Sequence, residues 1–210
     1  MSNNAQENIN QLTNKAKIRY LDISNRDLSG DADLKEFTAL TSLNSYNNKF
    51  ENLDFLNTLP NKDQLKKINF FGNQIKELDL AWILTNFPNL ECLNCENNPL
   101  SAKNLENLTS EQFGKLVQGI KDKKIKINSF KGTILMDLLE YAQKLVAKGD
   151  NNQTQNAQYL QALISSNSPA KDKQPGNNGS LLIGGLIVFG ISVLAIGYWW
   201  GKKRNEVKEE

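Results

Sequence analysis

One spacing recurs four times in the first half of the chain, and it limits the possible folds more than any other feature. Leu65, Ile68, Phe70, Asn73 and Ile75 stand at positions 1, 4, 6, 9 and 11 of the pattern L-x-x-L-x-L-x-x-N-x-L. Two copies lie 25 residues to either side of it, and a weaker copy precedes the first of these by 22 residues. The matching residues are Leu40, Leu43, Ser45, Asn48 and Phe50; Leu90, Leu93, Cys95, Asn98 and Leu100; and Ile18, Leu21, Ile23 and Leu28, with Arg26 at position 9. A fixed period of about 20–29 residues predicts a solenoid in which each unit adds one strand to a curved parallel sheet.

Residues 16–108, which carry these copies, resemble the leucine-rich repeat family. The stretch 93–98 (LNCENN) resembles the variant common in bacterial members, in which Cys fills an apolar position. The resemblance implies that Asn at position 9 bonds backbone groups left unpaired where the strand bends, because a buried unpaired amide costs about 1–3 kcal/mol. The predicted fold class is therefore α/β, a short right-handed leucine-rich-repeat solenoid of about four parallel strands.

The segments around the repeats differ from them in pattern. Residues 1–15 are polar, and residues 109–148 predict a helical C-terminal cap. Thr109 and Gln112 have the spacing of a capping box, Ile125 and Ile127 alternate as in a last edge strand, and Thr133 precedes a second amphipathic helix. Residues 149–179, rich in Asn, Gln, Ser and Gly, predict a flexible linker that could hold a short helix at 159–164.

Residues 180–200 are predicted to form a transmembrane helix, followed by a charged tail at 201–210. Positions 181–200 carry no charge, and a helix of that length spans about 30 Å, the thickness of a bilayer's hydrocarbon core. Aromatic residues at 198–200 and basic residues at 202–204 fit the edge of a membrane. The prediction is a single-pass membrane protein with a C-terminal anchor, in contact with the bilayer through residues 181–200.

Two orientations of this anchor are open, and the one with the large domain in the cytosol is preferred. The N-terminus lacks the apolar core of a signal peptide, which favours a large domain in the cytosol. The basic cluster after the span favours a large domain outside. The end of the chain also resembles the sorting signal of cell-wall-anchored surface proteins of Gram-positive bacteria. Residues 174–178 read QPGNN where that family has Leu-Pro-x-Thr-Gly, so sortase processing is not expected.

Composition argues against several kinds of chemistry. The chain has no histidine, so it lacks the commonest general base and metal ligand. Residues 1–179 hold 21 basic and 20 acidic side chains, a balance that does not favour nucleic acid as a partner. Cys92 and Cys95 form a C-x-x-C pair, but the repeat register directs Cys92 outward and Cys95 into the core. We expect no metal, no cofactor and no catalytic residue, and the chain is predicted not to be an enzyme.

The surface most suited to binding is the concave face of the predicted sheet. Strand alternation turns positions 3, 5 and 7 of each unit onto that face. Two exposed aromatic residues, Tyr46 and Phe71, lie side by side there, flanked by amides, and favour a protein-binding patch over idle surface. The candidate partner-binding residues are Tyr20, Asp22, Asn44, Tyr46, Lys67, Asn69, Phe71, Asn94 and Glu96.

The predicted function is that of a membrane-anchored leucine-rich-repeat module that binds a protein partner on its concave face. An outward-facing surface adhesin or host-interaction protein of a bacterium is the alternative. A structural spacer is also open. An enzyme such as a ligase with a catalytic cysteine is less expected, because residues 109–148 contain no cysteine.

Overall fold

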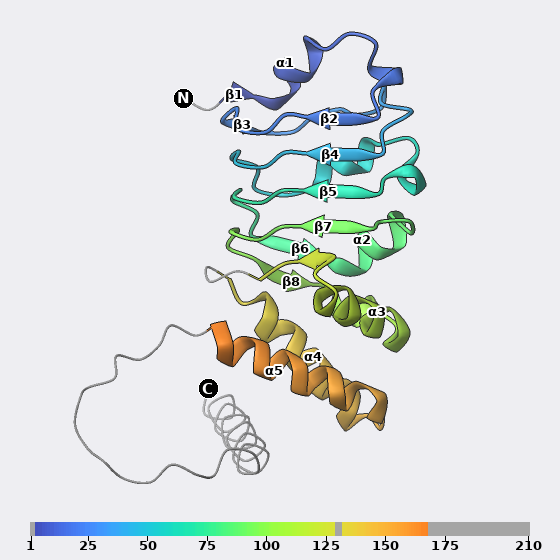
Figure 1. Cartoon of the computed structure of the whole chain (residues 1–210), viewed down its shortest axis with the longest axis vertical. Helices are drawn as coiled ribbons and strands as arrows, with labels where there is room; N and C mark the ends of the chain where they lie inside the picture. Colours follow the sequence, from blue (N-terminus) through green and yellow to red (C-terminus); the bar gives the residue numbers. More distant parts are fainter. Residues whose placement is uncertain (1–2, 129–131, 168–210) are drawn as a thin grey trace, which may run out of the picture. The chain divides into compact units, whose positions relative to one another are not determined.

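The strand segments of the four units pair side by side in one parallel sheet. The computed structural model describes residues 3–128 and 132–167, which belong to one compact unit, Met1–Ser168; the second unit, Pro169–Glu210, lies outside the described residues. The sheet has five strands in the order β2 (Tyr20–Asp22), β4 (Ser42–Asn44), β5 (Lys67–Asn69), β7 (Cys92–Asn94) and β9 (Ile125–Lys126) (Figure 1). The adjacent, parallel arrangement expected for the four units is confirmed.

The strands keep one register across the whole sheet. Leu21, Leu43, Ile68 and Leu93 pair in line, and Ile125 of β9 continues the line. The first four of these central side chains are at most 3% exposed, whereas the residues before and after each of them are exposed or half-buried. A strand turns successive side chains to opposite faces, so one row enters the core and its neighbours face outward.

Position 8 of every unit bends the chain out of its strand in the same way. Asn25, Asn47, Gly72 and Asn97 all have a positive φ, between 53° and 68°. Asparagine and glycine adopt this left-handed conformation more readily than other residues. A Cβ atom at Gly72 would also collide with Oδ1 of Asn47, so any other residue there would have to displace that side chain.

The asparagines at position 9, which we call the turn asparagines (Asn48, Asn73 and Asn98), join neighbouring units. Nδ2 of Asn73 donates to the carbonyl of Ser45, 3.0 Å away in the preceding unit, and to that of Phe70 at 3.1 Å. Its Oδ1 accepts from the N–H of Phe50 at 3.0 Å. Asn98 makes the equivalent bonds to Phe70 and Ile75. The role expected of Asn at position 9 is confirmed: it pairs buried backbone groups across units.

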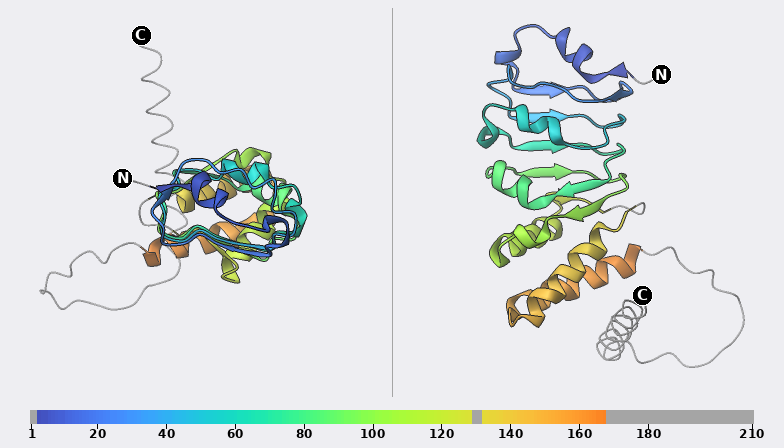
Figure 2. Two further views of the ribbon diagram at one scale, coloured as in Figure 1. Left: turned by 90° about the horizontal axis from the view of Figure 1, so that it is seen from above. Right: turned by 180° about the vertical axis from the view of Figure 1, so that it is seen from behind.

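The segments that return from one strand to the next differ from unit to unit. They include the short strands β3 (Leu28–Ser29), β6 (Glu77–Asp79) and β8 (Ser101–Lys103), the helix α2 (Leu80–Asn86) and the 3-10 helices η2 (Asp54–Thr58), η3 (Lys62–Gln64) and η4 (Leu105–Asn107). Two pairs of parallel strands, β1 (Asn3–Asn4) with β3 and β6 with β8, lie apart from the five-stranded sheet. Figure 2 shows α2 and the 3-10 helices behind the sheet, where they cover its buried face.

Both ends of the core are covered by helices. At the start, α1 (Ala5–Asn10) buries Ala5 and Ile9, and η1 (Lys15–Lys17) leads into β2. At the other end lie α3 (Ser110–Lys121), α4 (Ile134–Ala147), η5 (Asn151–Gln153) and α5 (Thr154–Asn167). Thr109 and Gln112 form the expected capping box of α3. The range 149–179, expected as a linker, includes α5, whose Leu160 is fully buried where the helix packs on α4.

The predicted fold class needs correction. The described residues form an α/β fold with a five-stranded parallel sheet and helices, not a solenoid of about four strands. The reason is that the segments that return from one strand to the next do not share one structure. The segment after β4 contains the 3-10 helix η2, whereas the corresponding segment after β5 contains the α-helix α2. A fifth strand, β9, joins the sheet from outside the repeats.

The predicted membrane anchor is corrected as well. Among residues 3–128 and 132–167, no helix combines the length and the apolar character needed to cross a bilayer. The transmembrane helix and the bilayer contact were expected from residues 180–200, and these lie outside the described residues. The described residues therefore do not support the expected single-pass membrane location.

Candidate functional site

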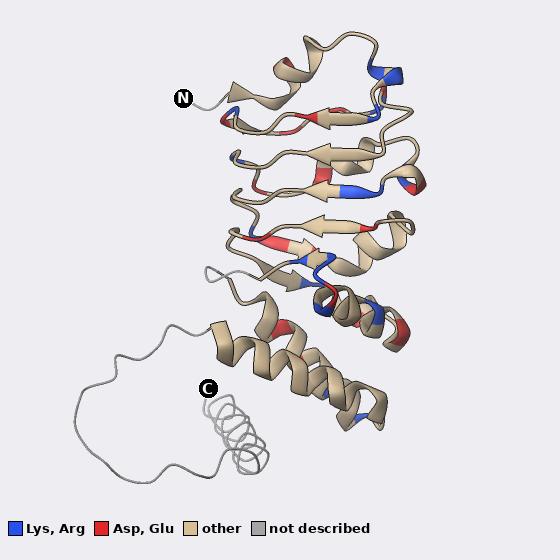
Figure 3. Ribbon diagram, in the orientation of Figure 1, with Lys and Arg blue, Asp and Glu red and all other residues tan. Residues whose placement is uncertain are grey.

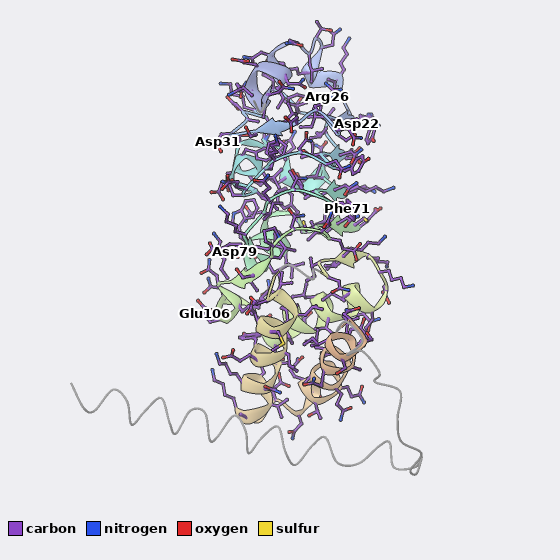
Figure 4. The ribbon with its side chains drawn as sticks, turned by 90° about the vertical axis from the view of Figure 1, so that its left-hand side faces the viewer. Asp22, Arg26, Asp31, Phe71, Asp79 and Glu106 are labelled. Carbon is purple, nitrogen blue, oxygen red and sulfur yellow. The ribbon has the colours of Figure 1, made fainter. Side chains whose placement is uncertain are left out.

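The outward face of the five-stranded sheet brings the candidate residues together. We call it the sheet face, made of Tyr20, Asp22, Asn44, Tyr46, Lys67, Asn69, Phe71, Asn94 and Glu96. Tyr20, Ser42, Lys67 and Cys92 pair in register at position 3, and Asp22, Asn44, Asn69 and Asn94 pair in register at position 5. Asp22 and Phe71 lie on one side of the molecule, with Asp31, Asp79 and Glu106 on the other (Figure 4).

Hydrogen bonds hold the position-5 row in one orientation. Nδ2 of Asn69 donates to Oδ1 of Asn44 at 2.9 Å, and Nδ2 of Asn44 donates to Oδ1 of Asp22 at 3.3 Å. In addition, Oδ1 of Asn69 accepts from the backbone N–H of Phe71 at 3.1 Å, and Oδ1 of Asn94 accepts from the backbone N–H of Glu96 at 3.2 Å. These side chains are therefore oriented before any partner arrives.

Asp22 ends this row with a negative charge. Its Oδ1 accepts from the hydroxyl of Ser24 at 2.6 Å and from the backbone N–H of Ser24 at 2.9 Å. These two bonds lower the pKa of Asp22, with smaller contributions from Asn44 and Tyr20, while partial burial opposes them. Hydrogen bonds to the charged form of a carboxyl group favour that form. The carboxylate is thus ionised at neutral pH and available to a cationic group.

The aromatic residues differ from the expectation in exposure. The rings of Tyr46 and Phe71 lie 6.3 Å apart at 44°, and both side chains are half-buried rather than exposed. Tyr20, which the alternation places on the same face, is 56% exposed, and its hydroxyl donates to Asp22 Oδ2 at 3.2 Å. The two rings lie side by side as expected, but neither is fully exposed, and Tyr20 is the most exposed of the three aromatic residues on this face.

Charged residues complete the face. Lys67 and Glu96 have no ion-pair partner within residues 3–128 and 132–167. Lys126 of β9, exposed and in register with Asn94, extends the position-5 row; repeat spacing cannot identify it because β9 follows α3. Acidic and basic residues are interspersed along the strands (Figure 3).

A shallow hollow of about 450 Å³ adjoins the amino ends of these strands, next to Tyr20 and Lys67. Thr41, Ser42, Lys66 and Glu91 complete its lining, and Lys66 is paired with Glu91 at 3.0 Å. Thr41, Lys66 and Glu91 do not lie at outward positions of the repeat, so the pattern gave no signal for them.

Arg26, the exception at position 9, lies at the first edge of the sheet. Its guanidinium donates to the carbonyl of Asp22 and to Oδ1 of Asn8, each at 3.0 Å. An unpaired strand edge tends to add foreign strands. Arg26 thus covers an edge carbonyl of β2 and ties β2 to α1, a task that a shorter Asn could not perform.

The two cysteines face opposite ways, as the register predicted. Cys92 is half-buried on the outward side, and Cys95 is fully buried. Burial raises the pKa of Cys95 to about 12, so its thiol stays protonated at neutral pH and is a poor nucleophile. The described ranges contain no group of three or more His, Cys, Asp or Glu side chains arranged to hold a metal ion.

Comparison of the chain with protein-family models and with curated proteins found no match. These comparisons therefore lend no support to membership of the leucine-rich repeat family.

Proposed function

We propose that residues 3–167 act as a protein–protein interaction module whose partner binds the sheet face. The observation that carries the proposal is the row Asp22–Asn44–Asn69, whose side chains are held by hydrogen bonds on one face of three adjacent strands. A surface already ordered loses little side-chain entropy on binding. The resemblance of residues 16–108 to the leucine-rich repeat family remains part of this proposal.

Aromatic and charged residues supply the rest of the argument. Tyr and Phe are enriched in protein interfaces, and Tyr20, Tyr46 and Phe71 lie on the same face. Neighbouring strands are about 4.8 Å apart, so five strands extend about 19 Å. That width suits a partner contact at the small end of the usual range, about 800 Å² a side or less. We propose binding, not catalysis, as the role of this face.

Photo-crosslinking tests the proposal in cells that make the full chain. The photoreactive amino acid benzoylphenylalanine replaces Tyr20 in one variant and Met136 of α4 in the control. The two positions are matched, since Tyr20 is 56% exposed and Met136 is 57% exposed. We expect position 20 to give one or a few discrete protein adducts and position 136 to give none of them.

A second change links the adduct to the face. In the position-20 variant, the further change Phe71→Ala should reduce the adduct about tenfold, because a central aromatic contact of an interface contributes about 1–2 kcal/mol or more. Identical adducts from positions 20 and 136, or no adduct from position 20, would contradict the proposal.

A further inference from the structure

A second hollow lies away from the sheet face, on the side where Asp79 is seen (Figure 4). It has a volume of about 430 Å³, within the range of about 300–1,000 Å³ typical of ligand sites. We call it the outer hollow, formed by Leu53, Asp54, Leu78, Asp79, Trp82 and Ile83. Leu53, Leu78 and Ile83 are at most 7% exposed and give it an apolar floor.

The charges around the outer hollow do not cancel. Its two lysines are each paired with a glutamate of the neighbouring unit: Lys76 lies 2.8 Å from Glu51. The other pair, Lys103 and Glu77, is 3.5 Å apart.

Two carboxylates remain without a cation. Asp79 receives only neutral donors, the N–H of Trp82 at 2.8 Å and the amide of Asn104. Asp54 is exposed and has no ion-pair partner within residues 3–128 and 132–167. The remaining charge of the hollow is therefore negative, which favours a cationic ligand.

Trp82 adds a second reason to expect a ligand. It is the single tryptophan of the described ranges and lies half-buried in the wall of the hollow, with its ring edge-to-face against Phe87 at 5.4 Å. Its indole N–H has no acceptor within those ranges. Indole rings attract cations over their faces, and tryptophan is enriched among the residues that dominate binding energy.

We propose that the outer hollow binds an arginine side chain presented by a segment of a partner protein. The guanidinium group pairs with the free carboxylate of Asp54 beside the ring of Trp82. A backbone carbonyl of the bound segment accepts from the indole N–H. Arginine fits better than lysine because its planar group can pair with a carboxylate and stack on an aromatic ring at once. This site is separate from the sheet face and does not depend on it.

The probe is a short peptide added to the full-length, nitrogen-15-labelled protein. Acetyl-Ala-Ala-Arg-Ala-Ala-amide is compared with the same peptide carrying citrulline, which has the shape of arginine without its charge. The readout is the NMR signal of the Trp82 indole N–H, identified by its loss in Trp82→Phe. We expect the arginine peptide to shift this signal in a saturable, salt-sensitive manner and the citrulline peptide to bind about tenfold more weakly.

Two variants locate the effect. Asp54→Asn should weaken binding of the arginine peptide about fivefold, and it should fold normally because the lost charge has no partner to leave unpaired. Asp63→Asn removes another exposed carboxylate, in η3 outside the lining of the hollow, and should change nothing. The double change Tyr46→Ala and Phe71→Ala should leave peptide binding intact, which separates this site from the sheet face.

Several results would overturn the proposal. One is an unmoved Trp82 indole signal at about 10 mM arginine peptide. Others are equal binding of the arginine and citrulline peptides, or an equal loss of arginine-peptide binding in Asp54→Asn and Asp63→Asn. A Trp82 signal that shifts with protein concentration alone would identify a second copy of the chain as the occupant and would overturn it too.

Discussion

Asn73 and Asn69 lie four residues apart in the same unit, yet they meet opposite surroundings. Asn73, one of the turn asparagines, is 7% exposed and bonds four backbone groups drawn from two units. Asn69 on the sheet face is half-buried and bonds the side chain of Asn44 and its own strand. The same amide group is thus a structural requirement at position 9 and an adjustable surface group at position 5.

The difference lies in what water can replace. If Asn73 is removed, the buried N–H of Phe50 loses its acceptor. The carbonyls of Ser45 and Phe70 each lose one donor and keep one other amide donor, from Asn48 and Asn98 respectively. If Asn69 is removed, its partners lie close enough to solvent for water to take its place. The comparison of inward and outward positions can therefore be tested by paired substitutions within one unit.

The largest effect is expected for the neighbours Phe70 and Phe71. Phe70 is fully buried against Phe50 and Phe55, with ring centres 5.7 Å from each. Phe70→Ala should lower the free energy of unfolding by about 4 kcal/mol because it removes contacts and leaves a cavity. Phe71→Ala should lower it by less than about 1.5 kcal/mol. Urea unfolding followed by circular dichroism measures both, and equal losses would contradict the inward and outward assignment.

The next effect concerns the two asparagines themselves. Asn73→Ala should lower the free energy of unfolding by about 3 kcal/mol, because it leaves the N–H of Phe50 and the carbonyls of Ser45 and Phe70 with fewer partners. Asn69→Ala is the matched control, with an expected loss of less than about 1 kcal/mol. Chemical unfolding of the two variants under the same conditions gives the comparison. If Asn69→Ala proved the more harmful change, the position-5 row would have to be structural.

The reactivity of the two cysteines tests the same difference between outward and inward positions. In the folded protein a thiol reagent such as dithionitrobenzoate should modify Cys92 at pH 8, and Cys95 should react only after unfolding. Cys92→Ser should abolish the fast reaction, and Cys95→Ser should leave it unchanged. Rapid labelling of both thiols in the native state would show that the fourth unit opens readily.

The buried thiol of Cys95 should also make the free energy of unfolding depend on pH. Its pKa is raised to about 12 in the folded state, from an ordinary value of 9.0. Between these values the unfolded chain releases a proton that the folded chain keeps, so the free energy of unfolding falls as pH rises above about 9. Cys95→Ala should flatten this decline between pH 9 and pH 11, measured against Cys92→Ala. An unchanged slope would assign the decline to other groups.

The smallest effect is expected at Asp22 in acid. The hydroxyl and N–H of Ser24 lower its pKa, so its contribution to stability is present above the unfolded pKa and is lost as pH falls through the folded value. Asp22 is exposed, and solvent screening should keep the contribution below about 1 kcal/mol. Asp22→Asn should slightly reduce the loss of stability between pH 6 and pH 2 in thermal unfolding. Ser24→Ala should do the same, and a larger effect in either would mean that the row contributes substantially to the fold.

Much of the inner framework could be predicted from spacing. The alternation around Leu43 and Ile68 predicted which side chains enter the core. The family resemblance carried by Asn48, Asn73 and Asn98 predicted that these amides bond backbone groups where the strands bend. These inferences succeeded because strand geometry repeats every two residues and because buried amides must be paired wherever they occur. The positions of Tyr46 and Phe71 followed from the same register.

Other features depend on contacts between distant segments, which local patterns do not encode. Lys126 joins the sheet face because β9 pairs with β7, and the half-buried state of Tyr46 and Phe71 was not indicated by their outward positions in the repeat. The outer hollow is lined by residues of three neighbouring units, among them Asp54 of η2 and Trp82 of α2. Spacing could therefore assign side chains to the inside or the outside of this protein. Their exposure and their neighbours were set by how the units pack, since both depend on side chains that come from different units.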